Sequence, residues 1–73
     1  MDIKQKVGNR IKELRKGLEL SQEALALKAD VDRTYVTDVE NGRRNVSLEI
    51  LERLIKALNV SIAEFFNSKE FKK

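Results

Sequence analysis

One local pattern occurs four times in this chain, and it constrains the fold more than any other feature. An apolar residue precedes Ser or Asp, and a second apolar residue follows five positions after the first. The four instances are Leu20-Ser21 with Leu25, Val31-Asp32 with Val36, Val46-Ser47 with Leu51, and Val60-Ser61 with Phe65. In this arrangement the side-chain oxygen caps a free amide of the first helical turn, and the two apolar side chains pack across it. The pattern therefore predicts four helix starts.

A further helix precedes these four, and no strand is expected. Apolar residues recur at spacings of three and four in Ile3, Val7, Ile11, Leu14 and Leu18, which is typical of an amphipathic helix. There is no proline, and no segment alternates apolar and polar residues for long. We expect an all-α chain with helices at about 2–17, 21–28, 32–40, 47–58 and 61–67, the third of which ends at Asn41-Gly42.

Length and composition exclude several classes of protein. With 73 residues the chain has room for one small domain, which we place at 1–67, followed by a polar tail at 68–73 that should fray. The absence of cysteine and histidine removes disulfides, thiol and imidazole chemistry, and nearly every transition-metal site, so no metal or cofactor is expected. Charges interrupt the first twenty residues, which argues against a signal peptide or membrane span and favours the cytoplasm.

The net charge of +3 permits a polyanionic partner without requiring one. The charges are unevenly distributed along the chain. Residues 1–18 hold six basic and two acidic residues, whereas residues 19–41 hold two basic and six acidic ones. A basic binding surface would therefore have to be assembled from more than one segment.

The second and third helices are expected to form a helix-turn-helix unit. Only residues 29–31 separate them, which is too short for an antiparallel pair and favours a steep crossing angle. Ala26 is expected at the closest approach of the two helices. The apolar residues that should hold the angle are Leu25, Ala29, Val31, Val36 and Val39.

The segments SQEALALKADVDRTYVTDVENG and RRNVSLEILERLIKALNV resemble the Xre-type helix-turn-helix regulators, which include the lambdoid phage repressors and Cro proteins. The resemblance covers about residues 7–66 and includes the spacing of Gln22, Ala26, the turn and the ENG end. It implies a compact five-helix lambda-repressor-like DNA-binding domain. The runs 32–35 and 44–45 are also similar to controller proteins of restriction–modification systems.

Asp30 departs from the family pattern, because the family usually has Gly in this turn. Asp tolerates the left-handed region better than most residues, so the turn should survive with modest strain. The alternative is a shifted third helix.

The resemblance also implies which residues meet DNA. In the phage repressors the second helix of the unit lies in the major groove. Position by position, the base-contacting residues would be Arg33, Thr34, Thr37 and Asp38, with Tyr35 nearby. An arginine fork can donate twice to guanine, and a threonine can contact a thymine methyl or hydrogen-bond a base. The phosphate-contacting residues would be Gln22, Asn41, Arg43, Arg44 and Asn45.

Two further sets are structural. Arg15 and Glu40 match positions that pair in the phage repressors, and we expect a partly buried ion pair. The last two helices carry more apolar surface than one thin face needs, which indicates a homodimer. Its contact residues would be Leu58, Ile62, Phe65 and Phe66. Such a dimer would present two recognition helices about 34 Å apart to a palindromic operator.

The favoured function is a sequence-specific transcriptional regulator that binds double-stranded DNA and does no covalent chemistry. It would block RNA polymerase or touch it, which makes polymerase a candidate partner. The alternative is a protein-interaction module such as an antitoxin, although the chain ends about seven residues after the fifth helix and lacks an antitoxin's usual extension. A small carboxylate enzyme has no supporting motif.

Overall fold

Every cap expected from the sequence forms in the computed structural model, which describes residues 2–72. The side chains of Ser21, Asp32, Ser47 and Ser61 each accept a hydrogen bond from an amide two or three residues further on, at 2.8–3.1 Å. Asp2 caps the first helix in the same way. Met1 and Lys73, the outer ends of the expected domain and tail, lie outside the described residues.

These caps begin five α-helices, and the all-α expectation is confirmed. They are α1 (Ile3–Gly17), α2 (Gln22–Ala29), α3 (Arg33–Glu40), α4 (Leu48–Ala57) and α5 (Ile62–Phe65), followed by a short 3-10 helix, η1 (Lys69–Phe71). Each boundary lies within about two residues of its expected place. Within residues 2–72 there is no strand.

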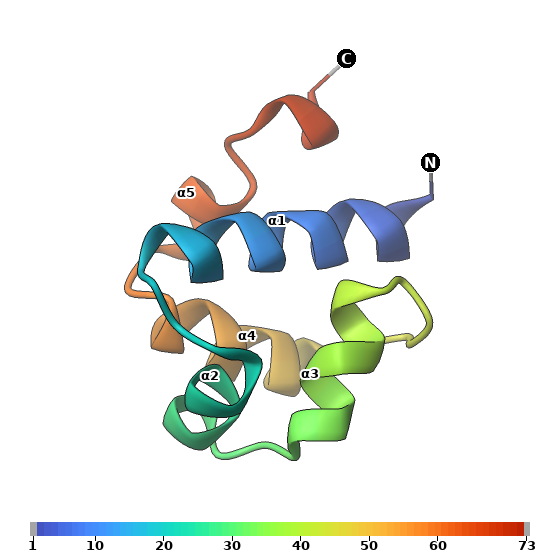
Figure 1. The fold of residues 1–73 in the computed structure, drawn as a ribbon. Coiled ribbons are helices and arrows are strands. Elements are labelled where there is room, and N and C mark those ends of the chain that lie inside the picture. Colours follow the sequence, from blue (N-terminus) through green and yellow to red (C-terminus); the bar gives the residue numbers. More distant parts are fainter. Residues whose placement is uncertain (1, 73) are drawn as a thin grey trace.

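Helix α1 runs across the molecule, with α2, α3 and α4 on one side and the chain after α5 on the other (Figure 1). It packs on α3 and η1, while α4 packs on α2 and α5. The largest fully buried apolar side chains come from all five helices or their ends: Phe65, Ile11, Leu25, Leu54, Ile55, Leu58, Val36 and Val39. One core therefore holds the helix-turn-helix unit against the other helices.

The turn between α2 and α3 accommodates Asp30 in the left-handed conformation, at φ 58° and ψ 49°. The amide of Val31 then donates to the carbonyl oxygen of Ala26 at 2.9 Å and closes the end of α2. Helix α3 begins at Arg33, directly after its cap, so the third helix is not shifted. Gly42, at φ 70°, ends α3 as expected.

The tail has more structure than the sequence indicated. The ring of Phe71 lies 4.8 Å from that of Phe66 and 6.1 Å from that of Phe65, centroid to centroid. Residues 69–71 therefore pack on the domain instead of fraying, because this single aromatic side chain fits against two others.

Helices α1 and α3 approach each other closely at Gly8, where a methyl group would overlap the carbonyl oxygen of Val39 and come within 2.9 Å of that of Glu40. We expect Gly8→Ala to lower the free energy of unfolding by about 1–3 kcal/mol, because the backbone of α3 cannot move aside without disturbing the packing of the two helices. This loss should exceed the gain from the higher helix propensity of alanine. Urea unfolding measures the change. The matched control is Gly17→Ala in the same helix, where nothing lies within 4 Å of the added carbon. Equal stability of the two variants would contradict the prediction.

Candidate nucleic-acid interface

Helix α3 turns one face to the core and leaves the other at the surface. Val36 and Val39 are buried, whereas Arg33 and Thr34 are exposed and Thr37 is half-buried. Within the described part of the chain, the outer face of the helix is therefore left uncovered. It carries the side chains to which the sequence resemblance gives base contacts.

Arg33 lies at the start of α3 and differs from Arg44, whose guanidinium is paired. Its side chain is exposed, and within residues 2–72 it makes no ion pair or hydrogen bond. It follows the Asp32 cap directly, as the first residue of α3. The guanidinium group is thus an available fork of donors at the helix start.

Arg44 lies in the loop after α3, but its side chain packs against α3. Its guanidinium lies 3.3 Å from a carboxylate oxygen of Asp38 and 4.3 Å from the centre of the Tyr35 ring. The Gly42 turn brings it back over the end of α3. A residue predicted to contact phosphate therefore meets two residues predicted to lie at the bases, and it neutralises the carboxylate on the outer face of α3.

The remaining residues predicted to meet phosphate lie at the two ends of the helix-turn-helix unit. Gln22 is the first residue of α2 and is half-buried. Asn41, Arg43 and Asn45 are exposed and follow the end of α3. This arrangement places polar groups on both sides of the exposed face of α3.

A buried carboxylate connects α1, α2 and α3. Glu40 is 1% exposed and accepts from Arg15 Nε at 2.6 Å and Arg15 Nη2 at 3.0 Å. Arg15 also donates to the carbonyl oxygen of Leu20 at 2.8 Å. The structure thus joins the two residues for which an ion pair was expected, and it places them under the helix-turn-helix unit.

Two side chains extend this polar cluster in a way that the sequence did not reveal. Gln22 Nε2 donates to Glu40 at 3.0 Å, and the Thr37 hydroxyl donates to Gln22 Oε1 at 2.9 Å. Sequence reasoning assigned Gln22 and Thr37 separately to DNA. Their contact joins the first turn of α2 to the middle of α3, 15 positions along the chain, and no local spacing signals it.

The structure corrects two of the four residues expected at a dimer contact. Leu58 and Phe65 are 1% and 0% exposed, because both fill the core of their own subunit. They offer no surface to a second copy. Ile62 remains 53% exposed, and Phe66 is half-buried.

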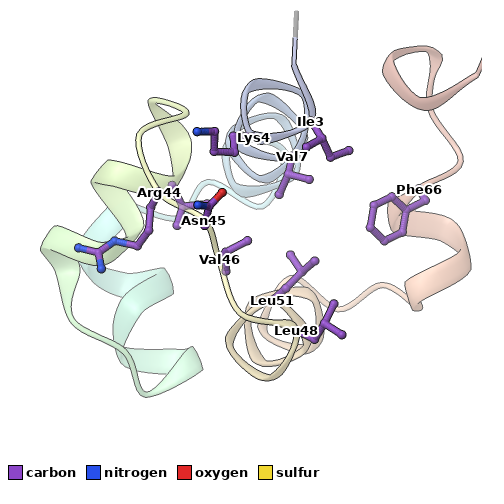
Figure 2. A pocket seen from close by; sticks show the side chains of 10 residues that line it. Ile3, Lys4, Val7, Arg44, Asn45, Val46, Leu48, Leu51 and Phe66 are labelled. Atoms are coloured by element: carbon purple, nitrogen blue, oxygen red, sulfur yellow. The ribbon is translucent and has the colours of Figure 1, made fainter.

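Phe66 lines an apolar groove, and Ile62 lines a second apolar pocket that shares Leu48 and Phe66 with it. The groove has a volume of about 300 Å³, and its apolar lining comes from α1, the end of α3, the loop before α4, α4 itself and the residue after α5 (Figure 2). Leu48, 85% exposed, and Ile3, 59% exposed, lie at its edge beside Phe66. Sequence reasoning missed Ile3 and Leu48 here. Ile3 was read as part of the α1 stripe, although it lies beyond the end of the core.

Arg10 fixes the position of Phe66 relative to α1. Its Nε donates to the carbonyl oxygen of Phe65 at 2.8 Å, and Nη2 donates to that of Glu64 at 2.9 Å. These bonds satisfy carbonyl groups at the end of α5 and tie the groove's far wall to α1.

The described residues offer no other obvious site. No group of three or more acidic residues within 2–72 could hold a metal ion. None of the helices in this part of the chain is long and apolar enough to cross a membrane.

Comparisons with known proteins find helix-turn-helix regulators, several of them control proteins. A family model described as helix-turn-helix matches residues 11–65. Control protein C.MunI of Mycoplasma sp is 47% identical over 94% of this chain and 95% of its own length. The restriction–modification controller protein C.AhdI of Aeromonas hydrophila is 46% identical, with a TM-score of 0.83 over 86% of this chain and 96% of that one.

Several of the similar structures contain DNA. The restriction–modification controller protein C.Esp1396I, solved as a tetramer in complex with its natural 35 base-pair operator, is 37% identical to this chain. The TM-score is 0.92, and the match covers 100% of this chain and 99% of that one.

Proposed function

This chain belongs to the helix-turn-helix family, and from that membership we propose that it is a sequence-specific transcriptional regulator that binds operator DNA as a homodimer. The observation that carries the proposal is the uncovered outer face of α3, on which Arg33 and Thr34 are exposed and Thr37 is half-buried, beside further polar groups. Among its relatives, C.Esp1396I forms a complex with operator DNA. The likeness to C.MunI and C.AhdI supports control of a restriction–modification system.

In this proposal phosphate contacts and base contacts have separate roles. Gln22 and the residues that follow α3 hold the phosphates on either side, while α3 enters the major groove. Arg44 covers the negative charge of Asp38, which removes much of the repulsion that an acidic side chain would meet near DNA. The mild net charge of the chain is thus compatible with a polyanionic partner.

The second subunit binds through the apolar surface of Ile3, Leu48, Ile62 and Phe66. Support comes from the exposure of Ile3, Leu48 and Ile62, large apolar side chains that line two adjoining apolar pockets together with the half-buried Phe66. Two copies joined there would each present α3 to one half of a palindromic site.

The dimer regulates transcription by occupying the operator, where it either blocks RNA polymerase or contacts it. The proposal assigns no catalytic step to any residue. It places the protein in the cytoplasm, where its DNA is. The antitoxin alternative is not favoured, because the relatives described above are controller proteins.

Selection of bound sequences from random duplexes, carried out at two salt concentrations, tests this function. We expect an enriched palindrome whose half-sites are centred about one helical turn apart, or a multiple of that, with affinity falling as salt rises. Recovery of no preferred sequence would contradict the proposal. Recovery of a single half-site would contradict its dimeric part.

Arg33→Ala is expected to cost about 1–3 kcal/mol of binding free energy on the selected operator and to relax preference at one base pair. The reason is that the Arg33 guanidinium has no partner among residues 2–72 and can donate twice to guanine. Fluorescence anisotropy with operators altered at each position measures both effects.

Arg44→Ala provides the contrast for that measurement. We expect it to weaken binding to all duplexes and to lower the salt slope by about one, as for a lost phosphate contact. If Arg33→Ala instead weakened all sequences equally, Arg33 would be a phosphate contact and not a base reader.

A further inference from the structure

The orientation of the Gln22 side-chain amide is determined by its neighbours. A carboxylate accepts hydrogen bonds and does not donate them, so the buried Glu40 must face the amide nitrogen of Gln22, at 3.0 Å. The amide oxygen then faces the Thr37 hydroxyl, at 2.9 Å. An amide oxygen also only accepts, so Thr37 is the donor in this contact.

The single hydroxyl proton of Thr37 is therefore committed within the protein. Besides Gln22 Oε1, the other acceptor in reach is the backbone oxygen of Arg33, at 3.2 Å. Either acceptor holds the hydroxyl toward the protein. What Thr37 retains for a ligand is its methyl group and the lone pairs of its oxygen.

Thr34 lies one helical turn earlier and is in a different state. Its side chain is exposed, and within residues 2–72 its hydroxyl has no hydrogen-bond partner. Its backbone amide, and not its hydroxyl, donates to the capping carboxylate of Asp32, at 2.8 Å. The Thr34 hydroxyl is thus free to donate.

We propose that the two threonines of α3 read different chemical features of a base pair: Thr37 reads the 5-methyl group of a thymine through its own methyl, and Thr34 reads a hydrogen-bonding base edge through its hydroxyl. This inference rests on the proposed function and assigns a separate specificity to each residue. Gln22 and Glu40 act as positioning residues, because they hold the Thr37 hydroxyl away from the bases.

Four variants and one change in the DNA test the inference. Serine keeps the hydroxyl and removes the methyl, whereas valine keeps the shape and removes the hydroxyl. Each replacement is made at Thr37 and at Thr34, so each position serves as the matched control of the other. The DNA probe is the selected operator with each thymine replaced in turn by uracil, which lacks only the methyl group.

At Thr37 we expect the methyl to decide. Replacing one particular thymine by uracil should lower the affinity of the unaltered protein about fourfold, which corresponds to the burial of one methyl or methylene group. Thr37→Ser should bind the thymine operator about fourfold more weakly and should no longer distinguish uracil at that position. Thr37→Val should keep the preference for thymine.

At Thr34 the opposite order is expected. Thr34→Val should lose about fivefold in affinity, as for one hydrogen bond, and Thr34→Ser should bind as the unaltered protein does. Thermal unfolding of all four variants shows whether any loss reflects the fold, and the uracil ratio of each variant is unaffected by a lower concentration of folded protein.

The outcomes separate the inference from the function on which it rests. If Thr37→Val loses the thymine preference while Thr37→Ser keeps it, Thr37 reads through its hydroxyl and the inference fails. If Thr34→Ser and Thr34→Val bind equally well, the assignment of Thr34 fails. If the unaltered protein selects no operator at all, the proposed function fails instead.

Discussion

Glu40→Ala is expected to lower the free energy of unfolding by about 3–5 kcal/mol, because it leaves the Arg15 guanidinium without its carboxylate in a largely buried place. The Arg15 side chain is 11% exposed and that of Glu40 is 0% exposed. Small domains are stable by only about 5–15 kcal/mol, so this single change removes a large part of the total. Urea unfolding followed by circular dichroism measures it.

Two controls accompany this experiment. Asp38→Ala breaks the more exposed ion pair with Arg44 and should cost less than about 1 kcal/mol. Replacing both partners, Arg15→Met with Glu40→Leu, should recover much of the lost stability, since no charge is then left unpaired. The prediction is wrong if Glu40→Ala costs no more than Asp38→Ala does.

Leu48→Glu is expected to separate the subunits and to weaken operator binding about a hundredfold. The reason is that each subunit then binds its half-site alone, without the second subunit holding it near the DNA. Leu48 is 85% exposed and is the first residue of α4, where a carboxylate is favourable to the helix. The variant should therefore fold normally, and its effect should fall on association alone. Sedimentation gives the oligomeric state, and anisotropy gives the affinity.

Leu27→Glu is the matched control for self-association. Leu27 is similarly exposed, at 78%, but it lies in α2, away from the groove. It should leave the oligomeric state unchanged. If Leu48→Glu remained dimeric, the second copy would have to bind elsewhere.

Local sequence signals were sufficient for the five α-helices and for the exposed face of α3, but not for η1 in the tail. The caps at Ser21, Asp32, Ser47 and Ser61 act over three residues or fewer, so their effect can be read from adjacent letters. The left-handed turn at Asp30 follows from the same kind of local reasoning. The spacing of residues in the helix-turn-helix segment also indicated the family, which the comparison confirms.

The surface around α3 and the apolar groove depended on contacts between distant residues. Hydrophobic periodicity identified Leu58 and Phe65 as apolar, but only packing decided that they fill the core while Leu48 stays outside it. The reason is that periodicity gives the apolar face of a helix and not the amount of that face that its neighbours cover.

The sequence by itself determined which α-helices form and where they begin, because caps and apolar spacing act between near neighbours. The spacing of the same residues was enough to show the family. The tertiary structure alone decided that Arg44 lies over Tyr35 and that the Thr37 proton is committed to the protein. The first depends on the Gly42 turn, which returns the following loop to α3. The second depends on the Glu40 carboxylate and Gln22, which join α2 to α3 through hydrogen bonds too short to form before the fold is assembled.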